Sequence, residues 1–216
     1  MRRRRSIAGL LFALALSGWA DEPTYPVAFR IALDAPAEVV YLAGSFNQWQ
    51  PRMTPMTPDA DKRVWTLTLN LPAGAHQYKF VVNGTDWRTD PTAPAIDDGN
   101  GNLNSVVWVE PDGYNRPARL GDGHITRSAI RHEPSDLRDR NPIGGQLYLR
   151  LRVRKGDVAQ ATLLYRQNGR TRRLAMAPFV SDALYTYFRA QLPEADMEYW
   201  FELRDGRTRL RLPAGN

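Results

Sequence analysis

One stretch of the chain decides the fold: His76-Gln77-Tyr78-Lys79-Phe80-Val81-Val82-Asn83-Gly84. In an extended strand, successive side chains point to opposite faces, so the aromatic and aliphatic Tyr78, Phe80 and Val82 share one face. Lys79 lies on the other face and points outward. Asn83 and Gly84 both tolerate a positive φ, which is typical of a tight turn. The stretch therefore predicts a half-buried strand that ends in a turn.

The same period-two alternation recurs in short runs on both sides of residues 111–145, and no helix-period run of useful length occurs after the first twenty residues. Each run is short, rich in β-branched or aromatic residues, and bounded by Pro, Gly, Asn or Asp. The pattern predicts an all-β protein with two immunoglobulin-like β-sandwiches in tandem. The other expected strands are Val27 to Leu33, Val39 to Phe46, Val64 to Leu69, Ser105 to Val109, Gln146 to Val153, Ala161 to Arg166, Thr171 to Met176, Leu184 to Leu192, Met197 to Leu203 and Arg207 to Leu212.

Charge and composition divide the chain into four segments. Residues 21–110 hold 6 basic and 11 acidic groups, whereas residues 143–216 hold 13 basic and 7 acidic groups. Between them the alternation dissolves into Pro, Gly, Arg and Asp. We therefore expect a leader at 1–20, a first sandwich at 21–110, a linker or irregular extension at 111–142 and a second sandwich at 143–216.

The first twenty residues have the pattern of a signal peptide. Arg2-Arg3-Arg4-Arg5 precedes the apolar run Ile7 to Leu16, and the small residues Gly18 and Ala20 suit cleavage near Ala20. The apolar run is too short to span a bilayer. We therefore expect export to the periplasm or beyond, by either the Sec or the twin-arginine route. Cleavage leaves 25 basic against 23 acidic groups, so no polyanionic partner is implied.

The chain has no cysteine, so neither disulfides nor a lipidated N-terminal Cys supports it. Each sandwich must be stable through its own core. A catalytic (β/α)₈ barrel needs about 250 residues, which does not fit this length. We therefore expect no catalysis within these residues.

Four side chains of the first sandwich form a candidate sugar site. Sugar rings stack on exposed aromatic side chains, while polar groups bond the hydroxyls. Trp49 and Trp87 follow strands in polar surroundings, Lys79 points outward, and Asn104 precedes the last strand of this unit. Taken singly, Trp49 could close the sandwich end, Lys79 could be an ordinary solvated lysine and Asn104 a turn residue.

The order of these motifs resembles the family 48 carbohydrate-binding module, over about residues 26–110. The matching stretches are Gly44-Ser45-Phe46-Asn47-Gln48-Trp49, Gly74-Ala75-His76-Gln77-Tyr78-Lys79-Phe80, Trp87 with Asp90-Pro91, and Gly101-Asn102-Leu103-Asn104-Ser105. That module occurs in the β subunit of AMP-activated protein kinase, in isoamylases and in branching enzymes. The resemblance implies a glycogen- or starch-binding sandwich in which Trp49 and Trp87 stack on glucose while Lys79 and Asn104 bond hydroxyls.

The second unit resembles the N-terminal family 34 module of neopullulanases, cyclomaltodextrinases and maltogenic amylases, over about residues 128–212. The resemblance rests on Ile130-Arg131-His132-Glu133-Pro134, on Leu147 to Val158 and on Glu198 to Gly206. It implies a sandwich that shapes the substrate cleft or dimer contact of an amylase-type enzyme. Tyr185, Tyr187 and Trp200 are either a secondary aromatic sugar surface or, as their strand spacing favours, core or interface residues.

Other functions find less support in the sequence. Asp97-Asp98-Gly99-Asn100-Gly101-Asn102 lacks the register of a calcium loop, so we expect no metal or cofactor. Arg150, Arg152 and Arg154 share one strand face, which predicts a solvated face or a packing surface for a partner domain rather than a nucleic-acid site. The sequence thus predicts an exported, non-catalytic α-glucan-binding protein without stable membrane insertion. Two alternatives stay open: an accessory part of a family 13 glycoside hydrolase without its barrel, and a docking sandwich without ligand.

Overall fold

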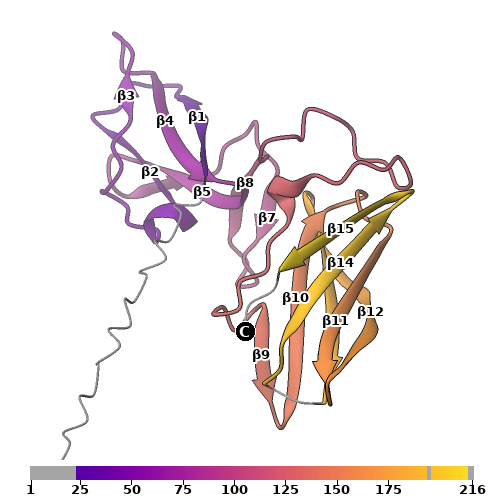
Figure 1. The fold of residues 1–216 in the computed structure, drawn as a ribbon. Coiled ribbons are helices and arrows are strands. Elements are labelled where there is room, and N and C mark those ends of the chain that lie inside the picture. The colour runs from indigo at the N-terminus through magenta and orange to yellow at the C-terminus, as the bar shows by residue number, and fades with distance from the viewer. Residues whose placement is uncertain (1–22, 194–195, 214–216) are drawn as a thin grey trace, which may run out of the picture.

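The structure, a computed structural model, describes residues 23–193 and 196–213. The predicted leader at 1–20 lies outside the described residues. The described chain forms two lobes, each built from β-strands (Figure 1). The predicted fold class, all-β with two tandem immunoglobulin-like sandwiches, is confirmed. No helix in the described ranges is long and apolar enough to cross a bilayer.

The first lobe packs two antiparallel sheets against each other. The sheet with the order β1-β4-β3 consists of β1 (Thr24–Ala32), β4 (Val64–Pro72) and β3 (Thr57–Pro58). The facing sheet has the order β2-β5-β8-β7, with β2 (Val40–Gly44), β5 (Gly74–Val82), β8 (Leu103–Val109) and β7 (Ala95–Asp97). A further strand, β6 (Asp86–Arg88), pairs with β5. Their shared core includes Phe29, Ile31, Trp65, Leu42, Phe80 and Val82.

Strand β5 confirms the alternation on which the fold prediction rests. Tyr78, Phe80 and Val82 are at most 5% exposed and belong to this core. Asn83 and Gly84 both have positive φ, as predicted for the turn. Val81 shares the outward face with Lys79 by the same period of two, yet it is fully buried. It pairs with Tyr41 of β2 on one side and with Trp87 of β6 on the other, so β5 is flanked on both sides at this position.

The second lobe is a single folded sheet rather than two separate ones. Its strand order is β15-β14-β11-β12-β13-β10-β9. The first part of β12 pairs with β11, and its last residues pair with β13 after a register shift between Pro178 and Val180. This twelve-residue strand therefore belongs to both layers. The strands are β9 (Arg140–Ile143), β10 (Gln146–Arg154), β11 (Gln160–Gln167), β12 (Arg170–Ser181), β13 (Tyr185–Leu192), β14 (Tyr199–Asp205) and β15 (Thr208–Pro213).

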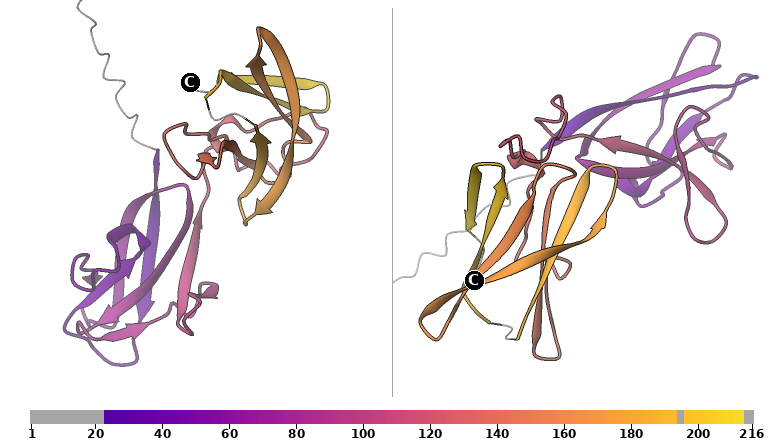
Figure 2. Two further views of the ribbon diagram at one scale, coloured as in Figure 1. Left: turned by 90° about the horizontal axis from the view of Figure 1, so that it is seen from below. Right: turned by 90° about the vertical axis from the view of Figure 1, so that its right-hand side faces the viewer.

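The chain between the lobes is not a free linker: it runs along the surface of the second lobe (Figure 2). Arg154, which is 7% exposed, donates hydrogen bonds to the carbonyls of Gly113, Tyr114 and Arg116. Its guanidinium also lies over the Tyr114 ring, 4.0 Å from the centroid. Further along, the buried carboxylate of Asp205 accepts the backbone N–H groups of Gly121 and Gly123 at 2.7 and 2.8 Å. We call this tied segment, residues 112–131, the clasp; it includes the short 3₁₀ helix η2 (Arg127–Ala129).

The clasp also joins the second lobe to the first. Trp108 of β8 packs against the small cluster of Ala129, Leu184 and Tyr185, together with Tyr114. The face of β10 that bears Arg150, Arg152 and Arg154 is thus a packing surface over much of its length, but it packs against the chain's own clasp and not against a partner domain as predicted. Arg152 lies over the Tyr185 ring at 4.1 Å and Arg150 over the Tyr187 ring at 5.1 Å.

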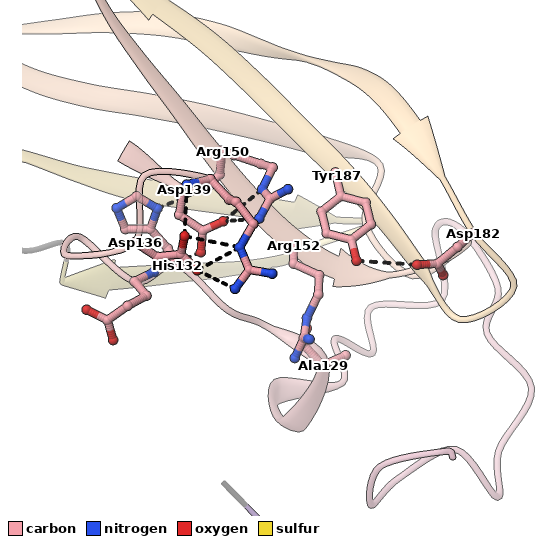
Figure 3. A network of polar contacts seen from close by, with 10 residues as sticks. Ala129, His132, Asp136, Asp139, Arg150, Arg152, Asp182 and Tyr187 are labelled. Atoms are coloured by element: carbon pink, nitrogen blue, oxygen red, sulfur yellow. Dashed lines mark hydrogen bonds and ion pairs between the residues drawn. The ribbon is translucent and has the colours of Figure 1, made fainter. Parts of the chain in front are cut away.

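A second strap, residues 132–139, crosses the same face beside the clasp (Figure 3). The Asp139 carboxylate, 3% exposed, accepts the Arg150 Nε at 2.7 Å and the backbone N–H of Glu133 at 3.0 Å. His132 packs edge-on against Phe201. Its Nδ1 lies 2.7 Å from the Arg150 carbonyl oxygen and its Nε2 lies 2.8 Å from the Tyr199 hydroxyl. The imidazole is therefore enclosed by core aromatics, and burial lowers the pKa of His132 below its ordinary value of 6.5.

Protonation of His132 is expected to destabilise the second lobe. Because its folded pKa lies below 6.5, the unfolded chain binds this proton more tightly than the folded chain does. Its contribution to stability is therefore complete above pH 6.5 and is lost as the pH falls from 6.5 through the folded pKa. Chemical unfolding at a series of pH values between 8 and 5 measures this loss.

A His132→Gln variant should have a flatter profile in that window than the wild type. His124→Gln serves as the matched control, since His124 is solvent-exposed and its replacement removes a histidine without touching the core. Parallel profiles for the wild type and His132→Gln would contradict the assignment.

Candidate functional site

The four predicted site residues lie around one hollow on the outer face of the first lobe. The hollow measures about 440 Å³ and is lined by Trp49, Gln77, Lys79, Trp87, Asp98, Asn102 and Asn104. These residues come from four places: the loop after β2, strand β5, strand β6 and the connection from β7 into β8. The fold thus brings together side chains that are up to 55 positions apart in sequence.

Trp49 is held at the rim by a tightly bonded loop. After β2 the chain makes the 3₁₀ helix η1 (Ser45–Asn47), and the Asn47 side chain bonds the Gly44 N–H, the Leu42 carbonyl and the Thr54 hydroxyl, each at 2.9 Å. Gln48 and Trp49 then adopt left-handed φ values of 55° and 60°. Such residues cost about 1 kcal/mol or more each, and they persist where surrounding bonds enforce them. Here the Trp49 N–H donates to the Gly44 carbonyl at 2.9 Å.

Gly44 explains why this motif begins with glycine. A Cβ on Gly44 would lie 2.5 Å from the Gln77 carbonyl oxygen and 2.8 Å from the Phe46 ring. Any side chain would therefore push the loop off β5. The close approach of the loop to β5 is what brings Trp49 beside Lys79.

Trp87 stands on the short strand β6, across from Val81, and is 42% exposed. Exposure of so large an indole is compatible with a stacking platform and not with a core role. Three residues further on, the buried Asp90 fixes the chain. Its carboxylate accepts the Tyr78 hydroxyl at 2.7 Å and the N–H and hydroxyl of Thr92 at 2.8 and 2.6 Å.

Asp90 is bonded on its backbone as well. Its own N–H donates to the Ser105 hydroxyl at 2.6 Å, and Ser105 is fully buried. Burial, and then the Asp90 carboxylate, raise the pKa of Tyr78 well above its ordinary value, so this hydroxyl stays protonated and donates. We call this set of residues, Tyr78, Asp90, Thr92 and Ser105, the anchor of the site.

The polar side of the hollow consists of amides and one pair of opposite charges. Lys79 is half-buried on the outward face of β5. Asn104 lies inside β8, not before it as predicted, and is only 5% exposed. Its Nδ2 donates to Gln77 Oε1 at 2.9 Å. Asn104 therefore lies at the bottom of the hollow while the two tryptophans lie at its rim.

Asp98 and Asn102 come from the turn-rich connection between β7 and β8. Asp98 accepts the N–H groups of Asn100 and Asn102 and the Asn102 side-chain amide. The Asn100 backbone bond is the largest cause that lowers the pKa of Asp98, followed by the Asn102 bonds and the charge of Lys79. The loop thus satisfies its carboxylates internally, and the described residues hold no cluster of His, Cys, Asp or Glu suited to a metal ion.

Gln77, Asp98 and Asn102 are lining residues that the predicted set omits. Gln77 could have been predicted from the sequence, because it lies two positions before Lys79 and therefore shares the outward face of the strand with it. Asp98 and Asn102 lie in a loop without periodicity, where the sequence offers no rule for side-chain direction.

The secondary aromatic surface of Tyr185, Tyr187 and Trp200 is not formed. Tyr185 is 2% exposed and belongs to the cluster at the lobe junction. Tyr187 is half-buried beneath Arg150 and donates to Asp182 at 3.3 Å. Trp200 lies on β14, separated from β13 by other strands of the folded sheet. Tyr185 cannot stack on a sugar because its ring is covered, and the three side chains do not share a surface.

A larger hollow of about 610 Å³ on the second lobe fits a sugar less well. It is lined by Tyr148, Phe179 and Arg189 among others. The Arg189 guanidinium lies 4.8 Å from the Phe179 ring centroid and 6.0 Å from that of Tyr148. The ring faces there are shared with a cation, whereas no described arginine or lysine lies over Trp49 or Trp87 within such a contact.

Two family models match the chain, one for each lobe. Residues 27–115 match the model described as the glycogen recognition site of AMP-activated protein kinase. Residues 125–213 match the model described as the alpha amylase N-terminal ig-like domain. Both resemblances expected from the sequence are therefore confirmed: the first lobe matches the glycogen recognition model and the second lobe matches the amylase N-terminal model.

Individual relatives share parts of the chain. Subunit beta-1 of 5'-AMP-activated protein kinase from Sus scrofa is 41% identical over 71 residues, which cover 33% of this chain and 54% of that protein. Subunit beta-2 from Mus musculus is 33% identical over 75 residues, covering 35% of this chain and 26% of that protein. The chain thus spans about half or less of these relatives. The solved maltogenic amylase from S. marinus aligns at 16% identity with a TM-score of 0.46, over 87% of this chain and 26% of that one.

Removal of the Asp90 carboxylate should weaken the first lobe and release Trp87. In Asp90→Ala, the buried Tyr78 hydroxyl and both Thr92 donors lose their acceptor, at a cost of about 3 kcal/mol in the free energy of unfolding. Urea unfolding followed by tryptophan fluorescence measures the change. Asp61→Ala is the control: this exposed carboxylate should shift stability by less than about 0.5 kcal/mol. Equal midpoints for the two variants would rule out the anchor.

Proposed function

We propose that this protein binds α-1,4/1,6-linked glucans such as starch, glycogen and maltodextrins through the hollow of the first lobe, without acting on them chemically. The observation that supports this most directly is the meeting of an exposed tryptophan, a half-buried tryptophan, a lysine and several amides in one hollow of the lobe that matches the glycogen recognition model. Few other ligand classes need that combination. The relatives that share this region include the kinase subunits, whose matching family is described by its glycogen recognition.

Each group has a separate task in this proposal. Trp49 and Trp87 present flat apolar faces on which the C–H faces of two glucose rings stack. Lys79 donates to ring hydroxyls, and Asn104 bonds a hydroxyl from below. Asp98 adds an acceptor at the rim. A hollow open to solvent, with only two platforms, suits weak binding that gains strength on a polymer with many equivalent sites.

Glucan binding is expected to depend on the two tryptophans in particular. Loss of one stacking contact costs about 1.5 kcal/mol, which is about a tenfold rise in Kd. In native gels containing glycogen, the wild type should be retarded, whereas Trp49→Ala and Trp87→Ala should migrate as in gels without it. Lys79→Ala should lie between.

Phe179→Ala is a matched control for the gel, because Phe179 is 44% exposed, close to the 42% of Trp87, and lies on the other lobe. It should be retarded like the wild type. A folded wild-type protein whose mobility glycogen leaves unchanged would refute the proposed function.

The protein is further proposed to act outside the cytoplasm. The support is the arginine-rich and apolar pattern of residues 2–20, with small residues before Asp21. Expression of the full chain in a bacterium should yield a periplasmic or secreted form whose N-terminal sequence starts near Asp21. A cytoplasmic product that retains Met1 to Ala20 would contradict export.

A second candidate role is favoured by the second lobe. Because residues 125–213 match an amylase N-terminal domain, we propose that this lobe places the glucan-binding lobe beside an amylase-type catalytic domain, in the same polypeptide or in a partner. In that role the protein is the accessory part of a glucan-degrading system. A purely structural pair of sandwiches leaves the two accessible tryptophans of the hollow without a use.

A further inference from the structure

The hydrogen bond between Asn104 and Gln77 sets which atom of the Asn104 amide is offered to a ligand. A primary amide donates through its nitrogen and accepts through its oxygen, so its role depends on which way the group is turned. Asn104 Nδ2 donates to Gln77 Oε1 at 2.9 Å. The nitrogen end of Asn104 is thereby engaged on β5, and the oxygen end is left for other partners.

Two further observations point to the hollow as the place where that oxygen is used. Both residues line it, and Asn104 is only 5% exposed. Among the described residues, Asn104 Oδ1 has no hydrogen-bond partner, yet it does not count among the fully enclosed unsatisfied atoms. An accessible acceptor therefore lies in a hollow that is also lined by the Lys79 ammonium, which can only donate, and by Asp98 and Asn102.

This arrangement matches the chemistry of neighbouring hydroxyls on a sugar ring. Each hydroxyl both donates and accepts, so a pair of them is recognised best by one donor and one acceptor placed together. If the Asn104 amide were turned around, Asn104 and Lys79 would both present donors to the diol, and the acceptor on β8 beside Lys79 would be lost. An unfixed amide would have to be ordered on binding, which lowers affinity.

We propose that Gln77 is a positioning residue of the glucan site: it holds the Asn104 amide with Oδ1 toward the ligand, so that Asn104 accepts from a glucose hydroxyl while Lys79 donates to the next. Gln77 acts through Asn104, because its Oε1 accepts the hydrogen bond from Asn104 Nδ2. The inference rests on the proposed function, and it adds to the site a residue that stacking and charge alone do not identify.

Isothermal titration with maltoheptaose on the full mature chain tests this role. Gln77→Met removes the acceptor at nearly constant volume and should raise Kd about tenfold. Gln77→Glu restores an oxygen acceptor for Asn104 Nδ2 and should remain within about threefold of the wild type. Gln160→Met is the control, since Gln160 is an exposed strand glutamine of the second lobe and should leave Kd unchanged.

A double-mutant cycle separates positioning from a direct or a merely structural role. If Gln77 acts through Asn104, the double variant Gln77→Met with Asn104→Ala should bind within about twofold of Asn104→Ala alone. Unfolding midpoints establish that each variant is folded, and Asn104→Thr replaces Asn104→Ala if the latter is not.

Each outcome supports or overturns a different statement. Wild-type binding with losses that multiply in the double variant overturns the positioning role and leaves the proposed function intact. The positioning role is likewise overturned if Gln77→Glu binds as weakly as Gln77→Met. A wild-type protein that binds neither maltoheptaose nor glycogen overturns both the positioning role and the proposed function.

Discussion

A buried carboxylate holds the first lobe in the form that the site requires. Asp90 receives three side-chain and backbone donors and donates its own N–H to Ser105, so every polar group around it is paired. An ionised group at 8% exposure is tolerable only with such complete bonding. The bonds run from β5 to the start of β8 and tie the connection that follows Trp87. The accessible indole can therefore stay at the surface without loosening the sandwich beneath it.

The other half of the rim depends on close backbone approach instead of charge. Gly44 lets the loop after β2 lie against β5, and the Asn47 side chain closes that loop with three hydrogen bonds. Two consecutive residues with positive φ, Gln48 and Trp49, are held there at some energetic cost. The two tryptophans are thus held by different means. The hydrogen bonds of the buried Asp90 fix the chain after Trp87, whereas the hydrogen bonds of the loop after β2 maintain the strained backbone at Trp49.

Much of this could be read from the sequence, for reasons that particular residues make clear. Lys79 and Tyr78 fall on opposite faces because a strand has period two, and Asn83-Gly84 turns where both residues tolerate positive φ. Burial of Val81 could not be foreseen, because it depends on the short strand β6, which has too few residues to show a period. Asp98 and Asn102 reach the hollow through a loop whose path depends on Asx-type bonds. Arg154 has the spacing of a solvated residue, and only the return of the chain after Gly113 encloses it.

The clasp also bears on what lies next to the hollow. Trp108 of β8 packs with Tyr114 against the cluster of Ala129, Leu184 and Tyr185, so the two lobes meet at a small apolar junction. A glucan has a reducing terminus at one end only. In the proposed function, the orientation in which the hollow holds the polymer therefore decides which terminus lies toward the second lobe, and which end of the polymer an adjoining domain would meet.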